Sequence, residues 1–257
     1  MNGSAMIDLG GQRIVVTGAA GGIGRAMVEV LSGFGASVVA CDLDEADLSF
    51  AGVGEAQRFD LLDDKAVEAA AKRICENGAP SAIISNAGWT RAETLDDVTP
   101  EALTHELNLN LRSAARLSQA FLPALRQREG GAAFVFISSI NALSHYGNPA
   151  YAAAKAGLIA WMRAVATEEG RHGIRANAIT PGSVRTMAWD HRIERDPEIL
   201  GKVGALYPLR RMVEPAEVAR AAAFLASPLS SGITGTVLPV DAGISAGNLP
   251  FLEQIAG

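Results

Sequence analysis

The chain has 257 residues, of which 49% are hydrophobic and 19% charged, and its net charge is −6. This size and composition fit one compact domain with a large buried core. Nucleic acid is excluded as a main partner, because no run of Lys or Arg exceeds two residues and phosphate binding needs concentrated positive charge.

The chain carries two cysteines, Cys41 and Cys75, which are too few for a disulfide framework or a four-ligand zinc site. We therefore expect free thiols in a reducing compartment and no bound metal. The first eleven residues lack the basic start and apolar run of a signal peptide. No stretch of about twenty apolar residues is present to span a membrane. The sequence thus predicts a cytoplasmic protein with no membrane partner.

Short β-branched apolar runs alternate along the chain with longer, alanine-rich segments. Strands are expected over residues 14–16, 37–41, 57–59, 82–85, 133–137, 174–179 and 236–240. Helices are expected over residues 23–34, 66–74, 100–128, 149–171 and 215–225. Strands that alternate with helices predict a parallel sheet covered on both sides. The expected fold class is α/β, a single Rossmann-type doubly wound parallel sheet of about seven strands with helices on both faces.

The segment over residues 187–207 interrupts this alternation. It is charged and contains Pro197. We expect a flexible helical flap that covers a site.

A glycine-rich turn lies between the first expected strand and the first expected helix. Residues 17–24 read TGAAGGIG, with four glycines in the last seven positions. Glycines let the backbone turn tightly and approach a pyrophosphate, which the N–H groups at the helix N-terminus can bind. A tight turn without a ligand is the alternative, and the density of glycine argues against it. The cofactor ligands predicted here are Gly18, Gly21, Gly22, Ile23 and Gly24.

Asp42 stands at the end of the second expected strand, eighteen residues after Gly24. A carboxylate at this place can accept hydrogen bonds from both hydroxyls of an adenosine ribose, and it repels a 2′-phosphate. The predicted cofactor is therefore NAD rather than NADP. The alternative for Asp42 is a helix N-cap, a role that Asp44 could serve equally well.

Tyr151 and Lys155 are four residues apart on one face of an expected helix, and Ser139 follows the preceding strand. A surface pair is the alternative for an isolated Tyr-x-x-x-Lys. The chemistry fits an alcohol dehydrogenase, because Tyr151 can exchange a proton with an alcohol oxygen while the Lys155 ammonium brings the pKa of that phenol closer to neutral pH. Ser139 would then orient the substrate oxygen.

Taken together, these residues resemble the short-chain dehydrogenase/reductase family over nearly the whole chain. Two departures stand out, since Ser85 replaces the first Asn of the family's NNAG motif and Ala242 replaces a glycine of its VDGG motif. Family spacings to the tyrosine vary by one, so Ser138 stays an alternative to Ser139. The matching positions are residues 17–24, Asp42, Asp60, Leu61, Asn86, Ala87, Gly88, Asn110, Ser139, Tyr151, Lys155, Pro181, Gly182, Thr186 and residues 234–243.

The resemblance also implies roles that the residue pattern alone does not assign. Asn110 would kink its helix and hold a water in a proton relay from Lys155. A homotetramer is implied as the assembly, and residues 1–257 would form one dinucleotide-binding and catalytic domain. The implied cofactor contacts are Asp60 and Leu61 at the adenine, Asn86, Ala87 and Gly88 at the adenosine, and Pro181, Gly182, Val184 and Thr186 toward the carboxamide.

The substrate is expected to be a small molecule bound by Trp89, Asn141, His145 and Trp189. Polar and cationic residues at the flap favour a sugar, polyol or hydroxy acid, although flap charges are usually solvated. The prediction is an NAD-dependent alcohol dehydrogenase or ketone reductase. Two alternatives stay open, a 3-oxoacyl thioester reductase and a non-catalytic NAD-binding regulator.

Overall fold

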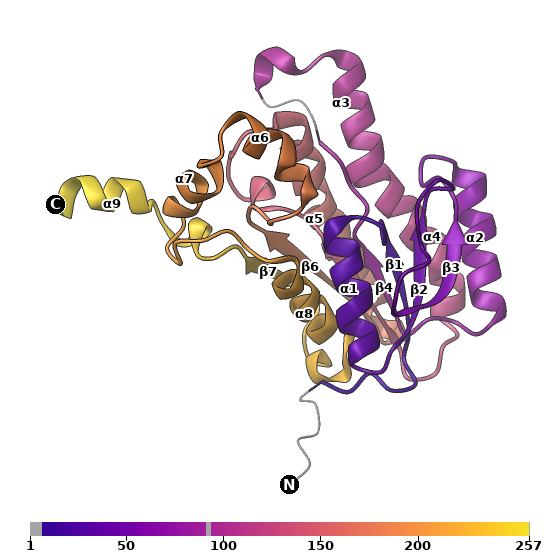
Figure 1. Cartoon of the computed structure of the whole chain (residues 1–257). Helices are drawn as coiled ribbons and strands as arrows, with labels where there is room; N and C mark the ends of the chain where they lie inside the picture. The colour runs from indigo at the N-terminus through magenta and orange to yellow at the C-terminus, as the bar shows by residue number, and fades with distance from the viewer. Residues whose placement is uncertain (1–6, 91–93, 257) are drawn as a thin grey trace, which may run out of the picture.

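A computed structural model describes residues 7–90 and 94–256 of the chain (Figure 1). Its centre is a seven-stranded parallel sheet with the strand order β3-β2-β1-β4-β5-β6-β7. The expected doubly wound Rossmann-type sheet is confirmed. The chain winds outward in opposite directions from the neighbours β1 and β4, and such a switch point leaves a crevice at the carboxyl ends of the strands. The strands are β1 (Arg13–Thr17), β2 (Ser37–Asp42), β3 (Val53–Arg58), β4 (Ala82–Ser85), β5 (Ala132–Ile137), β6 (Ile174–Pro181) and β7 (Val237–Val240).

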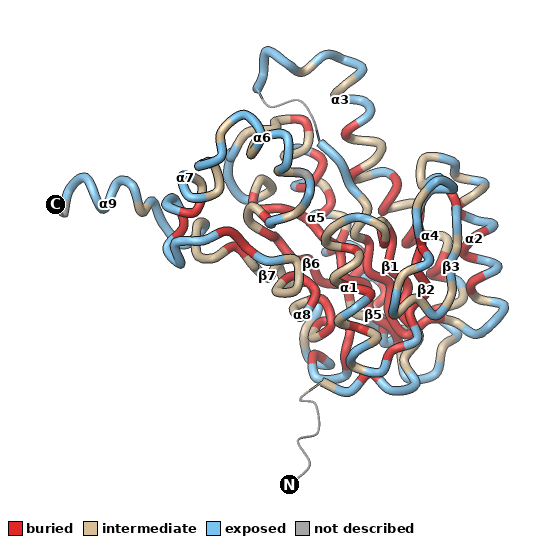
Figure 2. The backbone as a smooth tube through the Cα atoms, viewed as in Figure 1, coloured by how far each residue is buried: buried red, intermediate tan, exposed pale blue. Residues whose placement is uncertain are grey.

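Alternate residues of the central strands supply two apolar cores, one on each face of the sheet. Ile14 and Val16 of β1 belong to one core, and Val15 between them belongs to the other. Successive strand side chains point to opposite faces, so a sheet covered on both sides needs unbroken apolar runs. Full burial of each Val or Ile stabilises the fold by about 1.5–3 kcal/mol. Figure 2 shows the buried residues following these central strands.

The helices form a layer on each face of the sheet (Figure 1). One core packs against α1 and α8, and the other packs against α2, α4 and α5. Helix α2 begins two residues before its expected start, because the Asp63 side chain caps it by accepting hydrogen bonds from the amides of Lys65 and Ala66. The bounds are α1 (Gly22–Gly33), α2 (Asp64–Glu76), α4 (Ser113–Leu125), α5 (Pro149–Glu169) and α8 (Pro215–Ala226).

The edge strand β3 is longer than the sequence predicted. It begins at Val53, four residues before the expected start, and none of its residues is fully buried. An edge strand has one exposed side, so its residues need not be apolar. Because Gly54 and Glu55 are not apolar, the beginning of β3 does not show as an apolar run in the sequence.

The helix expected over residues 100–128 is interrupted. Helix α3 (Pro100–Leu107) is followed by one π-helical turn (Asn108–Arg112) before α4 begins at Ser113. The resemblance implied a kink at Asn110, and this wider turn lies there. Such turns are rare in proteins, and those that occur are often found at functional sites.

The segment over residues 187–207 is helical, as expected, and contains α6 (Asp190–Arg195) and α7 (Ile199–Ala205). Its flexibility and its role as a flap stay predictions. A further helix, α9 (Leu249–Ala256), was not predicted and extends away from the body at the left of Figure 1. Among the described helices, none combines the length and apolarity needed to cross a bilayer.

Candidate active site

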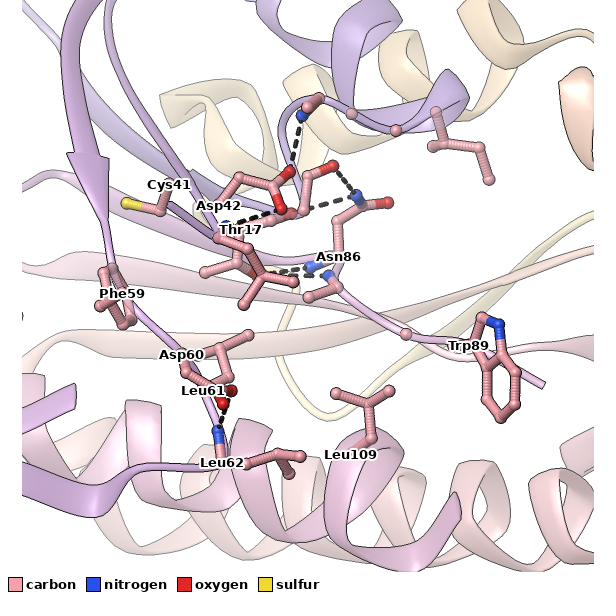
Figure 3. Close-up of a pocket in the computed structure, with 18 of the residues that line it drawn as sticks. Thr17, Cys41, Asp42, Phe59, Asp60, Leu61, Leu62, Asn86, Trp89 and Leu109 are labelled. Carbon is pink, nitrogen blue, oxygen red and sulfur yellow. Dashed lines mark hydrogen bonds between the residues drawn. The ribbon is translucent and has the colours of Figure 1, made fainter. Parts of the chain in front are cut away.

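A cavity of about 790 Å³ opens at the carboxyl ends of β1, β2, β3 and β4. Figure 3 shows its lining side chains, which come from the glycine-rich turn, from the ends of these strands and from the loop after β4. Most of the residues predicted to bind a cofactor lie in this one place. The predicted residues that line it are Gly18, Gly21, Gly22, Ile23, Gly24, Asp42, Asp60, Leu61, Asn86, Ala87, Gly88, Trp89 and Thr186.

The glycine-rich turn is so close to its neighbours that side chains are excluded. A Cβ at Gly24 would lie 2.0 Å from the Gly18 carbonyl oxygen, and one at Gly18 would lie 2.8 Å from the Ala87 Cα. Gly18 also has a φ of +64°, which favours glycine. Helix α1 begins after Gly21 with no side-chain cap and no acidic residue in its first turn. Its N-terminus is therefore suited to an anionic ligand.

Asp42 is held by the backbone on both sides. Its Oδ2 accepts a hydrogen bond of 2.8 Å from the Ala20 amide, and its Oδ1 accepts one of 2.9 Å from the Leu43 amide. Residues 43–52 form turns rather than a helix, so the N-cap alternative is wrong. Each carboxylate oxygen has two lone pairs, which leaves acceptor capacity for a ribose hydroxyl. Among the described residues that line the cavity there is no Lys or Arg.

The loop after β4 is joined to the glycine-rich turn by Asn86. Its Nδ2 donates to the carbonyl oxygens of Thr17 and Gly18 at 3.0 and 3.1 Å, and its amide donates to the Thr17 hydroxyl at 3.1 Å. Figure 3 shows these bonds. The side-chain amide of Asn86 thus braces two loops that line the cavity.

The two serines after β5 have different partners. The Ser139 hydroxyl forms a hydrogen bond with Tyr151, whereas the Ser138 hydroxyl is buried and donates to the Lys155 carbonyl oxygen at 2.9 Å. Both hydroxyls thus contact α5, but one bonds its main chain and the other bonds the Tyr151 side chain. The geometry therefore favours Ser139 as the partner of the tyrosine.

Tyr151 and Lys155 lie together at the start of α5. The Lys155 Nζ is 5.4 Å from the centre of the Tyr151 ring and donates to the Ile137 carbonyl oxygen at 2.8 Å. Burial raises the pKa of Tyr151 to about 12 and lowers the pKa of Lys155 to about 8. In the free protein, burial thus moves the pKa of Tyr151 away from neutral pH, opposite to the shift expected from Lys155, and the protonated phenol can donate a proton.

Asn110 in the π-helical turn approaches Lys155 across Gly88. The Asn110 side chain donates to the Trp89 carbonyl oxygen at 2.8 Å and accepts from the Trp89 amide at 3.1 Å. A Cβ at Gly88 would lie 2.7 Å from Asn110 Oδ1 and 3.1 Å from Lys155 Nζ. The absence of a side chain at Gly88 thus leaves room for both groups beside it.

Comparison with known proteins fits this geometry. A family model described as "Enoyl-(Acyl carrier protein) reductase" matches residues 18–245. A (3R)-3-hydroxyacyl-CoA dehydrogenase of Mus musculus is 35% identical, over 90% of this chain and 95% of that protein. The crystal structure of a short-chain dehydrogenase/reductase family oxidoreductase from Burkholderia thailandensis has a TM-score of 0.88 at 35% identity, over 95% of this chain and 97% of that one.

The chain belongs to the short-chain dehydrogenase/reductase family. Oxidoreductases of this family use a nicotinamide cofactor, NAD or NADP. The ligand-free aldohexose dehydrogenase of Thermoplasma acidophilum is also similar, with a TM-score of 0.86 at 27% identity over 94% of this chain and 96% of that one.

The main chain near Val184, which is expected to hold the carboxamide, forms a short parallel bridge, and the expected role stays a prediction. Val184 pairs with Val213 through the Arg185 amide and the Ser183 carbonyl. The amide and carbonyl of Val184 itself therefore point away from Val213. Pro181 ends β6, and Gly182 follows it. Thr186 packs closely on Gly22, because a Cβ at Gly22 would lie 2.8 Å from the methyl carbon of Thr186.

Of the four residues predicted to bind the substrate, one lines the cavity. Trp89 lines the cavity and is 45% exposed. Asn141 braces its own loop by donating to the Gly147 carbonyl oxygen at 2.7 Å, His145 is exposed, and Trp189 lies beside the Arg192 guanidinium. Substrate contacts by Trp89, Asn141, His145 and Trp189 all stay predictions.

Two residues near the site were missed by sequence reasoning. His105 packs edge-on against Trp89 at the cavity wall, with ring centres 5.4 Å apart. Glu106 is buried beside Asn110. Its spacing of four residues before Asn110 on an expected helix was the available signal, because residues four apart share a helix face.

Proposed function

We propose that the protein is an NAD-dependent dehydrogenase or ketone reductase that acts on a secondary alcohol or its ketone. The observation that carries the proposal is the Tyr151 hydroxyl, which is hydrogen-bonded by Ser139 and has the Lys155 ammonium beside its ring. A regulator without chemistry would not need this arrangement.

The three side chains divide the work on the substrate oxygen. When bound, the nicotinamide takes or gives the hydride. For ketone reduction, Ser139 holds the substrate oxygen and the neutral Tyr151 phenol donates its proton to it. For alcohol oxidation, Tyr151 must first lose that proton, and the positive charge of Lys155 stabilises the phenolate that results. We propose that Lys155, which lies beside the Tyr151 ring, and Asn110 support proton exchange between the tyrosine and solvent.

NAD is the proposed cofactor because Asp42 lines the cavity at the end of β2, where a carboxylate would meet the adenosine ribose. A carboxylate there accepts from ribose hydroxyls and repels a phosphate on the 2′-oxygen. The cavity wall as described has no cation that would reverse this preference.

We propose a polar substrate, such as a sugar, polyol or hydroxy acid, and the likeness to an aldohexose dehydrogenase supports this class. A 3-oxoacyl thioester is the second candidate, because the matching family model and the mouse relative carry names of acyl-thioester enzymes. A homotetramer is the proposed assembly. The exposed apolar residues Phe251, Leu252 and Ile255 on α9 support self-association, and light scattering of the purified protein measures it.

The test follows NADH absorbance while the protein is mixed with NAD and a panel of sugars, polyols, hydroxy acids, secondary alcohols and a 3-hydroxyacyl thioester. We expect turnover on one class. The Tyr151→Phe variant should lose that turnover by roughly 1,000-fold, within the range for general acid–base catalysis, and should still bind NADH. Turnover on the thioester alone would select the second candidate. Retained activity in Tyr151→Phe would overturn the acid–base assignment.

A further inference from the structure

Glu106 is a buried acidic residue in α3 that the mechanism above does not use. It is 1% exposed and lies four residues before Asn110. Glutamate is almost never buried to this degree without partners, because removing a carboxylate from water is costly. Its burial therefore calls for partners whose interactions offset this cost.

The main chain and the carboxylate of Glu106 both face the NH₂ group of Asn110, which also donates to the Trp89 carbonyl oxygen. The Asn110 Nδ2 donates to the Glu106 main-chain oxygen at 3.0 Å and faces its carboxylate Oε2 at 3.4 Å. The Thr90 hydroxyl donates to the other carboxylate oxygen at 3.1 Å. With its NH₂ group turned toward these acceptors, Asn110 presents Oδ1 to the Trp89 amide and to the gap at Gly88. A flipped carboxamide would place two donors together at Trp89.

The charge of Glu106 also acts on the two catalytic groups of α5. Lys155 is 2% exposed, and its ammonium donates to a neutral carbonyl oxygen. Burial lowers the pKa of Lys155 to about 8, and the negative charge of Glu106 opposes this by raising it. The same charge raises the pKa of Tyr151. Among the described residues, the titratable groups that touch or act on Lys155 are Tyr151 on its own helix and Glu106 on α3, while His105 packs against Trp89.

We propose that Glu106 is a positioning residue of this active site, whose buried carboxylate orients the Asn110 carboxamide and balances the buried ammonium of Lys155. The inference rests on the proposed function, because the protonation of Lys155 matters to a catalytic Tyr151. Without the carboxylate, the pKa of Lys155 falls below about 8, so less ammonium is present at neutral pH and the Tyr151 phenolate loses its charge partner.

The titration of Lys155 tests this without any substrate. The chain has four lysines, so isotope-labelled lysine ε-carbons are resolvable by NMR, and the Lys155 signal is identified by its absence from Lys155→Met. In Glu106→Gln the Lys155 signal should titrate on the order of one pH unit lower than in the wild-type protein. Glu101→Gln is the matched control, because it removes an exposed negative charge from the same helix and should leave the titration unchanged.

A Lys155 titration in Glu106→Gln equal to that of the wild type would overturn the proposal. If Glu106→Gln does not fold, as judged by circular dichroism, Glu106→Asp carries the test, because it keeps the charge. It should retain a Lys155 titration close to that of the wild type, and a large downward shift would contradict the charge role. Neither result depends on turnover, so failure of the proposed dehydrogenase activity is recognised separately, by silence of the wild-type protein with the NAD panel.

Discussion

Replacing Asp42 by Ala should change which nicotinamide cofactor the protein prefers. The substitution removes the carboxylate whose free lone pairs are proposed to accept from the ribose hydroxyls. Hydrogen bonds to a charged group contribute about 1.5–3 kcal/mol, so NADH should bind roughly 10- to 100-fold more weakly. A unit negative charge of a 2′-phosphate placed about 5 Å from the carboxylate is repelled by about 1–3 kcal/mol at effective dielectric constants between those of water and a protein surface. Removing the carboxylate relieves that repulsion for NADPH.

The two effects act in opposite directions on the two cofactors. The ratio of NADPH affinity to NADH affinity should therefore rise by roughly 100- to 10,000-fold in Asp42→Ala. Fluorescence titration with each reduced cofactor measures this ratio, and Asp44→Ala is the matched control, since it removes an exposed carboxylate two residues away. An unchanged ratio in Asp42→Ala would refute the reasoning and would mean that another residue selects the cofactor.

Two further substitutions test the packing of the site and of the core. Gly88→Ala should lower turnover by roughly 100-fold on the substrate that the NAD panel identifies, because its Cβ would lie 2.7 Å from Asn110 Oδ1 and displace the Asn110 and Lys155 side chains. Gly33→Ala is the control, because its Cβ meets nothing within 4 Å, and it should leave turnover unchanged. Leu117→Ala should lower the free energy of unfolding by about 2–5 kcal/mol in urea titrations, since the side chain is 1% exposed. Leu95→Ala, at a side chain that is 78% exposed, should change it by less than about 0.5 kcal/mol, and equal effects of the two leucine substitutions would contradict the assigned burial.

Short sequence patterns predicted an element correctly where a single physical requirement fixes which residues it can contain. A strand buried on both faces must be apolar along its length, so β1, β4, β5 and most of β6 were predictable from short apolar runs. The glycine-rich turn was recognisable because close backbone approach excludes side chains, as at Gly24. The edge strand β3 and the helix α9 lacked such a signature, because both are largely exposed and few of their side chains must be apolar to pack.

The sequence by itself determined the sheet of alternating strands and helices, the glycine-rich turn and the positions of Asp42, Tyr151 and Lys155, since each depends on spacing within one element and its flanking turn. The tertiary structure alone decided between Ser138 and Ser139, because that choice depends on which hydroxyl reaches the side chain of Tyr151. It also revealed the buried charge of Glu106. Whether a helical carboxylate faces solvent or an active site is set by the partner against which the helix packs, and that partner lies some fifty residues further along the chain.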